Sequence, residues 1–138
     1  MKLLDKIDYH KLKEAVNQVT INNLFARSVI EQHVSGTIYV DDTEDPETYY
    51  VIHPYGMSLL FGDCHNETFN KSFRDYVLNR HKPRDTDEWM QAWPDTWHHV
   101  FKGLLDDELK PGGQAGIVEQ HTRVNFRFDK ESDRKSVV

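Results

Sequence analysis

The amino-acid sequence predicts a mixed α/β (α+β) fold, in which helices pack on a mixed, mostly antiparallel sheet. Segments with apolar residues at helical spacing alternate with short segments rich in β-branched and aromatic residues. Their order is helix, helix, three strands, helix, strand, helix, strand. The chain of 138 residues is also long enough to build one hydrophobic core. We therefore expect a single domain over residues 1–128 and a charged tail over residues 129–138.

The first part of the chain, residues 8–35, predicts two helices. Asp8 is suited to cap the first helix, and Thr20 is suited to cap the second. The second helix has apolar residues at offsets of 3, 4 and 8, which are Ile21, Leu24, Phe25 and Val29. Gly36 is expected to end this helix, because glycine readily adopts the left-handed conformation found after helix ends.

Three short strands are predicted next, over residues 37–40, 49–53 and 57–61. The last two flank a Pro-Tyr-Gly sequence and should form a hairpin around Gly56. A helix capped by Asn66 should follow. Its apolar residues lie on one face at offsets of 4, 7 and 8, and they are Phe69, Phe73, Tyr76 and Val77.

Tryptophans recur every four residues near the middle of the chain and would share one face of a continuous helix. Pro94 argues against that helix, because a proline inside a helix costs roughly 3 kcal/mol. We therefore expect a strand over residues 88–93 and a new helix that begins at Pro94 or Asp95.

The last third of the domain predicts less regular structure. Residues 106–116 are acidic and then rich in proline and glycine, which is typical of an exposed loop. Residues 122–128 alternate apolar and polar side chains, which predicts a strand with one solvated face.

Composition narrows the classes of function. With 38% hydrophobic residues and no long apolar run, the sequence predicts neither disorder nor a membrane span. A net charge of −6 argues against nucleic acid and anionic membranes as partners. Cys64 is the only cysteine, and the N-terminus lacks the apolar stretch of a signal peptide, so we expect a cytoplasmic protein.

Candidate metal ligands are present, but their spacing does not predict a metal site. No His-x₃-His pair occurs on a common helix face, and the adjacent His98 and His99 would point about 100° apart on a helix. The candidates are His53, Cys64, His65, His98 and His99. We expect no bound metal, and we expect the three tryptophans to serve the core rather than an aromatic binding platform.

The hairpin gathers the residues best suited to proton transfer. His53, Tyr55 and Ser58 lie within six positions of one another, and Asp63 follows at the end of the second strand. A base, a phenol and an orienting carboxylate suit general acid-base chemistry. The alternative is that these polar groups bond the backbone of their own turn. Cys64 as a nucleophile would need a positive partner, and an inert buried thiol is the simpler interpretation.

Several strings in the chain resemble the N-terminal half of a bacterial group of GNAT-type acetyltransferase proteins, and the similarity covers most of residues 20–128. The strings are Gly36-Thr-Ile-Tyr-Val-Asp-Asp42, Ile52-His-Pro-Tyr-Gly-Met-Ser-Leu-Leu-Phe-Gly62, Glu67-Thr-Phe-Asn70, Glu88-Trp-Met90, Pro94-Asp-Thr-Trp97 and Arg123-Val-Asn-Phe126. The resemblance implies a two-lobed protein, in which a degenerate GNAT-like N-terminal half precedes a half that binds acetyl-CoA.

The cofactor loop that this family uses is not recognisable in the sequence. GNAT enzymes hold the cofactor pyrophosphate on an Arg/Gln-x-x-Gly-x-Gly/Ala loop between a strand and a helix. Lys110-Pro-Gly-Gly-Gln-Ala115 is the nearest string and lacks both the first residue and the flanking elements. After the hairpin, Gly62-Asp-Cys-His-Asn-Glu67 offers one glycine and two acids, which would repel a pyrophosphate.

Two functions follow as expectations. The first is a GNAT-family domain that supports acetyl transfer from acetyl-CoA to an amine only together with a cofactor-binding lobe, with candidate residues His53, Tyr55 and Ser58. The second is a noncatalytic interaction or small-ligand-binding module with the same fold. The expected partner is either the cofactor-binding lobe or a second copy of the chain in a homodimer.

Overall fold

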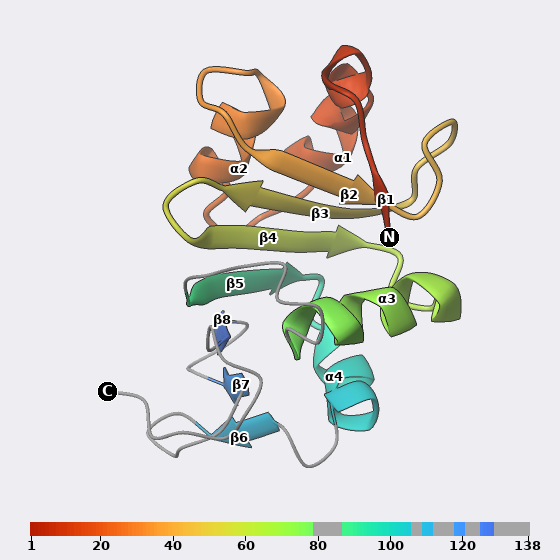
Figure 1. The fold of residues 1–138 in the computed structure, drawn as a ribbon, viewed down its shortest axis with the longest axis vertical. Helices are drawn as coiled ribbons and strands as arrows, with labels where there is room; N and C mark the ends of the chain where they lie inside the picture. The colour runs from red at the N-terminus through yellow and green to blue at the C-terminus, as the bar shows by residue number, and fades with distance from the viewer. Residues whose placement is uncertain (79–86, 106–108, 112–117, 121–124, 129–138) are drawn as a thin grey trace.

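A mixed sheet forms the centre of the structure, with helices on both of its faces (Figure 1). The computed structural model describes residues 1–78, 87–105, 109–111, 118–120 and 125–128. The described strands are β1 (Lys2–Leu3), β2 (Thr37–Val40), β3 (Thr48–His53), β4 (Met57–Gly62), β5 (Glu88–Trp93), β6 (Leu109–Pro111), β7 (Val118–Gln120) and β8 (Asn125–Phe128). The described helices are η1, a 3₁₀ helix (Lys6–Leu12), α1 (Lys13–Asn17), α2 (Leu24–Ile30), α3 (Glu67–Val77) and α4 (Trp97–Leu105).

The strands lie in the order β1-β2-β3-β4-β5-β8-β7-β6. Within the described residues, the pairs β4/β5 and β6/β7 are parallel and the other pairings are antiparallel. The predicted α+β fold with a mostly antiparallel sheet is therefore confirmed. The helix α3 makes the crossover that lets β5 run parallel to β4.

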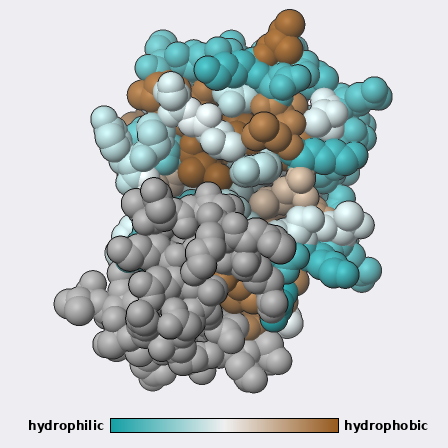
Figure 2. Space-filling model, viewed as in Figure 1, coloured by the Kyte–Doolittle hydropathy of each residue, from teal (hydrophilic) through white to brown (hydrophobic). Residues whose placement is uncertain are grey.

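Two hydrophobic cores result from the alternation of side chains along the strands. One core lies between the sheet and α3 and α4, and includes Tyr50, Leu60 and Phe73. The other lies between the sheet and η1, α1 and α2, and includes Val51 and Phe61. In the view of Figure 2, hydrophilic residues cover much of the upper part of the molecule, and hydrophobic side chains lie between them. None of the described helices has the length and apolar content needed to cross a membrane.

The predicted hairpin and its following helix are confirmed. Gly56 has a φ of +82°, a conformation that favours glycine in the turn between β3 and β4. The side chain of Asn66 accepts a hydrogen bond of 2.9 Å from the backbone N–H of Phe69 and caps α3. The predicted apolar face of this helix is buried in the first core. The strands predicted over residues 37–40 and 88–93 are also present.

The second helix is shorter than predicted. It begins at Leu24, not after Thr20, because the Asn23 amide donates to the carbonyls of Val16 and Val19 and holds the connection to α1 in a bend. Leu24 is 72% exposed and does not belong to the core stripe. The helix ends at Ile30, so Gly36 does not terminate it.

Gly36 has a different role, which is close packing. A Cβ at this position would lie 2.6 Å from the carbonyl oxygen of Ile52 and 2.7 Å from Val29 Cγ1. The absence of a side chain therefore lets β2 begin directly against β3 and α2. The first predicted helix is also divided, because residues Lys6–Leu12 form a 3₁₀ turn before α1 and Asp8 lies inside that turn.

Two further expectations were wrong in detail. Residues 106–116 do not form only a loop, because Leu109–Pro111 is the strand β6. Its place at the edge of the sheet tolerates a proline, which lacks the N–H for a further partner. The helix α4 begins at Trp97, two to three residues later than predicted, after a turn in which the Trp97 N–H donates to the Pro94 carbonyl. Of the strand predicted over residues 122–128, residues 125–128 form β8, and residues 122–124 lie outside the described part.

Candidate functional site

The hairpin candidates are divided between the two faces of the sheet. His53 is the last residue of β3 and lies on the α2 face, where its ring centroid is 6.4 Å from that of Phe25. Its Nδ1 accepts a hydrogen bond of 3.2 Å from the backbone N–H of Tyr55. Tyr55 is 86% exposed at the tip of the turn. The His53 ring is therefore bonded within its own turn, as the alternative interpretation of the sequence expects.

Ser58 lies on the opposite face, because side chains alternate along β4. The structure does not bring Ser58 together with His53. It also separates His53 from Asp63, because His53 pairs with Met57 at one end of the hairpin and Thr48 pairs with Gly62 at the other. The intervening strand spans roughly 20 Å. The hairpin turn does bring the base and the phenol together, with the ring centroids of His53 and Tyr55 5.1 Å apart, but the carboxylate of Asp63 is not part of this group.

Ser58 instead belongs to a buried polar cluster centred on Glu88, the first residue of β5. Ser58 Oγ donates a hydrogen bond of 2.9 Å to Glu88 Oε2, and the Tyr50 hydroxyl donates to the same oxygen. Tyr76, from α3, donates to Glu88 Oε1 at 2.5 Å. The Tyr50 hydroxyl also lies 3.0 Å from Ser58 Oγ. The cluster thus links β3, β4, α3 and β5 at one point.

Burial dominates the electrostatics of this cluster. Glu88 is 3% exposed, and burial raises the pKa of its carboxyl from the ordinary 4.5 to about 8. Three hydroxyl donors favour the charged form, but the loss of water outweighs them. Within the described residues, no Lys, Arg or His forms an ion pair with Glu88. The group therefore holds its proton at neutral pH and behaves as a buried carboxylic acid.

Glu88 is not among the site residues predicted from the sequence, although the sequence contains a usable signal for it. The strand over residues 88–93 was predicted, and its alternation places Glu88 on the same face as Met90 and Ala92, which are buried. A carboxylate in phase with two apolar residues is expected to be buried and to need hydroxyl partners. The pattern of one strand cannot identify those partners, because they are set by the register of the sheet and by the position of α3.

The loop between β4 and α3 is the place where a GNAT-type diphosphate site would lie, and its geometry does not fit an anion. The Asp63 carboxylate accepts the N–H of His65 at 3.0 Å, and the Asn66 side chain accepts the N–H of Phe69. The Asp63 N–H donates to the Glu47 carbonyl. Side chains of this chain therefore already occupy N–H groups that a diphosphate would use.

Charge around this loop reinforces the same conclusion. Glu67 lies in the first turn of α3, and the Asn66 amide donates to the Asp41 carboxylate at 3.4 Å. With Asp63, three carboxylates surround the helix N-terminus, where a diphosphate would need positive charge. The residues present here do not fit the diphosphate of acetyl-CoA. In the alternative string, Lys110 lies in β6, and residues 112–115 lie outside the described part.

The remaining candidates do not converge on a metal site in the described part of the chain. Cys64 is buried, and its thiol lies 3.5 Å from Thr96 Oγ1 and 3.7 Å from His65 Nε2. No three His, Cys, Asp or Glu side chains converge as a metal centre among the described residues. The tryptophans lie at different depths, since Trp97 is fully buried, Trp93 is half-buried and Trp89 is 47% exposed.

The chain is similar to a curated protein of Bacillus subtilis (strain 168), the uncharacterized N-acetyltransferase YdfB. The two sequences are 25% identical over 113 residues, which cover 82% of this chain and 40% of the relative. The chain thus spans about two fifths of the length of this relative. No family model matches the chain. The similarity supports a distant relationship to N-acetyltransferases.

Proposed function

We propose that this chain is a GNAT-type domain that supports acetyl transfer from acetyl-CoA to an amine acceptor, together with a cofactor-binding lobe. The similarity to an N-acetyltransferase over 82% of the chain carries the proposal. The fold is compatible with it, because the structure has helices packed on a mixed sheet in an α+β arrangement. In this proposal the chain provides one wall of the acceptor pocket.

A separate cofactor-binding lobe is part of the proposal because of the β4–α3 loop. Its N–H groups are occupied by the side chains of Asp63 and Asn66, and carboxylates surround it. The matched region covers 40% of the relative. In this proposal the cofactor-binding lobe, or a second copy of this chain, provides the site for the diphosphate.

The hairpin end of the sheet is the surface that we assign to this partner. Tyr55 is 86% exposed, Trp89 is 47% exposed and Met57 is 36% exposed. Met57 and Trp89 are direct neighbours across the parallel β4/β5 pair. Large apolar side chains grouped in this way are typical of surfaces that another protein covers. His53, Tyr55 and Ser58, at the same end of the sheet, stay the first residues to test for a contribution to acetyl transfer.

We assign no catalytic role to Glu88. Its carboxyl is buried and already bonded to Tyr50, Ser58 and Tyr76, so a substrate amine would have to displace packed side chains to reach it. The cluster instead fixes the ends of β4 and β5 beside the hairpin. Ser58 would act by positioning these strands.

A noncatalytic interaction or small-ligand module is the second candidate, and the unsuitable β4–α3 loop favours it for the chain by itself. Isothermal titration of the folded chain with acetyl-CoA and with CoA tests this point first. Both proposals expect no binding to the chain alone. Micromolar binding would show that a cofactor site exists in this chain and would contradict the need for a second lobe.

A chimera separates the two candidates. The matched region of the Bacillus relative would be replaced by this chain, and amine-dependent release of CoA would be measured with a panel of amines. The intact relative serves as the positive control. Turnover by the chimera that falls on Tyr55→Ala and Trp89→Ala substitution supports the acetyl-transfer proposal. A folded chimera without turnover, beside an active relative, would favour the noncatalytic module.

A further inference from the structure

A hollow of about 400 Å³ lies at the end of the sheet opposite the hairpin, between α1 and the last residues of β4 and β5. Its lining combines three aromatic side chains with three carboxylates. The aromatic residues are Tyr49, Phe61 and Trp93, and the carboxylates are Glu14, Glu47 and Asp63. This volume is within the range of small-molecule sites, which is roughly 300–1,000 Å³.

The aromatic part of the lining is rigid. Tyr49 and Phe61 are stacked, with ring centroids 4.8 Å apart and an interplanar angle of 25°. The Tyr49 hydroxyl donates to the carbonyl of Pro46 at 2.7 Å, and the Trp93 indole N–H donates to Thr20 Oγ1 at 3.0 Å. The polar atoms of Tyr49 and Trp93 are therefore bonded within the protein. Tyr49 is 9% exposed and Phe61 is 1% exposed, so the half-buried ring of Trp93 offers a ligand most of the aromatic surface.

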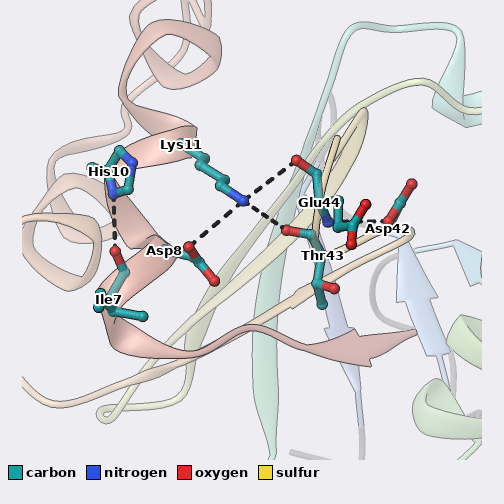
Figure 3. A network of polar contacts seen from close by, with 7 residues as sticks. All are labelled: Ile7, Asp8, His10, Lys11, Asp42, Thr43 and Glu44. Carbon is teal, nitrogen blue, oxygen red and sulfur yellow. Dashed lines mark hydrogen bonds and ion pairs between the residues drawn. The ribbon is translucent and has the colours of Figure 1, made fainter.

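The charge of the lining is negative. Glu14, Glu47 and Asp63 face a single ammonium group, that of Lys11. Lys11 Nζ donates to the carbonyls of Thr43 and Glu44 and lies 3.6 Å from the Asp8 carboxylate, so it is directed to the loop after β2 (Figure 3).

The three carboxylates of the lining lack a positively charged partner among the described residues. Within the described residues, none of Glu14, Glu47 and Asp63 forms an ion pair. Burial raises the pKa of Tyr49, and the carboxylates of Asp41, Glu47 and Asp45 raise it further. Of these three carboxylates, Glu47 lines the hollow. The hollow thus combines uncompensated negative charge with the accessible part of the Trp93 ring.

We propose that this hollow binds an organic cation, an ammonium, amidinium or guanidinium group carried on a flat apolar body. Carboxylates attract the charge, and the quadrupole of an aromatic ring attracts a cation that lies over its face. A phosphate or carboxylate ligand would be repelled by the same acids. A bare metal ion is disfavoured, because the described residues bring no three metal-ligating side chains together.

Binding at this site does not depend on the proposed acetyl transfer. It lies roughly 20 Å, the length of β4, from the hairpin end to which we assign the partner lobe. Binding of a cation here needs neither acetyl-CoA nor a second lobe. A direct binding measurement on the full chain alone therefore tests the inference, whatever the outcome of the chimera experiment.

Benzamidine, benzamide and benzoate provide a matched set of probes, because they share a ring and a nearly equal shape and differ in charge. Each would be titrated into ¹⁵N-labelled protein and followed by two-dimensional ¹H–¹⁵N spectra, with the Trp93 indole resonance assigned by Trp93→Phe. We expect saturable shifts of this indole and of the Glu47 and Asp63 amides with benzamidine. Benzamide should bind at least about tenfold more weakly, and benzoate should not bind.

Variants locate the binding on the lining. Glu14→Gln and Glu47→Gln should each weaken benzamidine binding about two- to fivefold, as exposed charge pairs do. Glu31→Gln removes an equal charge outside the hollow and should leave binding unchanged. Trp93→Leu should weaken binding more than Trp93→Phe, although both lose the bond to Thr20.

Three results would overturn the inference. The first is benzamide binding as tightly as benzamidine. The second is an equal loss in Glu31→Gln and Glu47→Gln, which would indicate a general effect of net charge. The third is the absence of saturable shifts up to the solubility limit of benzamidine in protein whose spectrum is that of a folded chain.

Discussion

The buried carboxyl of Glu88 makes the stability of this protein depend on pH in an unusual direction. Burial raises the pKa of Glu88 in the folded state to about 8, whereas the unfolded chain keeps a value near 4.5. The folded state therefore binds the proton more tightly. The stabilising contribution is complete below about pH 4.5, and it is lost as the pH rises to about 8.

The magnitude follows from the size of the pKa difference. One pKa unit corresponds to about 1.4 kcal/mol, so the rise at Glu88 amounts to about 5 kcal/mol of lost unfolding free energy above pH 8. Typical domains have unfolding free energies of about 5–15 kcal/mol, so this single group is a large fraction of the total. Most exposed carboxylates have the opposite effect or none.

Glu88→Gln isolates this contribution from the other titrating groups. The amide is close in shape to the protonated carboxyl and does not ionise in this range. Urea unfolding of both proteins from about pH 4 to about pH 9 should show similar stability at the acidic end. The variant should become more stable than the wild type by several kcal/mol at the alkaline end. An exposed control, Glu31→Gln, should follow the wild-type curve.

A constant difference between wild type and Glu88→Gln across this range would refute the reasoning. It would mean that Glu88 titrates alike in the folded and unfolded states and that the carboxyl is not effectively desolvated. A wild type that gains stability over Glu88→Gln as the pH rises would refute the sign.

Three further substitutions test individual contacts, each by urea unfolding. Tyr76→Phe removes the hydrogen-bond donor to Glu88 Oε1 and should lower the free energy of unfolding by about 1–3 kcal/mol. The loss should be larger at high pH than at low pH, because this hydrogen bond favours the charged carboxylate. An equal loss at all pH values would contradict this role. Asn66→Ala removes the cap of α3 and should cost about 1 kcal/mol, and no loss would show that the cap is unimportant. Gly36→Ala should cost about 1–3 kcal/mol because its Cβ would overlap the Ile52 carbonyl, whereas Gly103→Ala, with open space around it in α4, should be neutral or stabilising.

Local patterns in the sequence predicted those elements whose structure is set by local chemistry. Gly56 is required by the turn between β3 and β4, and Asn66 is suited to a helix start by its side chain. Pro94 correctly indicated that β5 and the helix after it are separate elements. These signals involve residues within a few positions of one another, so a single sequence contains them.

Features that depend on tertiary contacts were not predicted. In the sequence, Gly36 cannot be distinguished from a glycine that ends a helix. In the structure, glycine is needed there because the Ile52 carbonyl of β3 and the Val29 side chain of α2 leave no space for a Cβ. The strand β6 is three residues long and exists through pairing with β7, a partner that local composition does not reveal. Short segments of this kind take their structure from the sheet.

The candidate sites show the same division between local and distant information. Proximity in the sequence grouped His53, Ser58 and Asp63, but a strand turns successive side chains to opposite faces and carries its two ends far apart. Register, not proximity, places Ser58 beside Glu88, thirty positions away, and brings Glu47 beside Asp63 at the far end of the hairpin.

The β4–α3 loop connects the two proposals of function through its charge. Asp63 both accepts the N–H of His65, which would otherwise be available to an anion, and contributes a carboxylate to the aromatic hollow beside α1. A position that would serve a diphosphate if it offered free N–H groups therefore favours positive charge instead. The negative charge of Asp63 repels the diphosphate of acetyl-CoA and attracts a cation. The same side chain therefore makes acetyl-CoA binding by this chain unfavourable and cation binding favourable. The two titrations, with acetyl-CoA and with benzamidine, should consequently give opposite results on one protein sample.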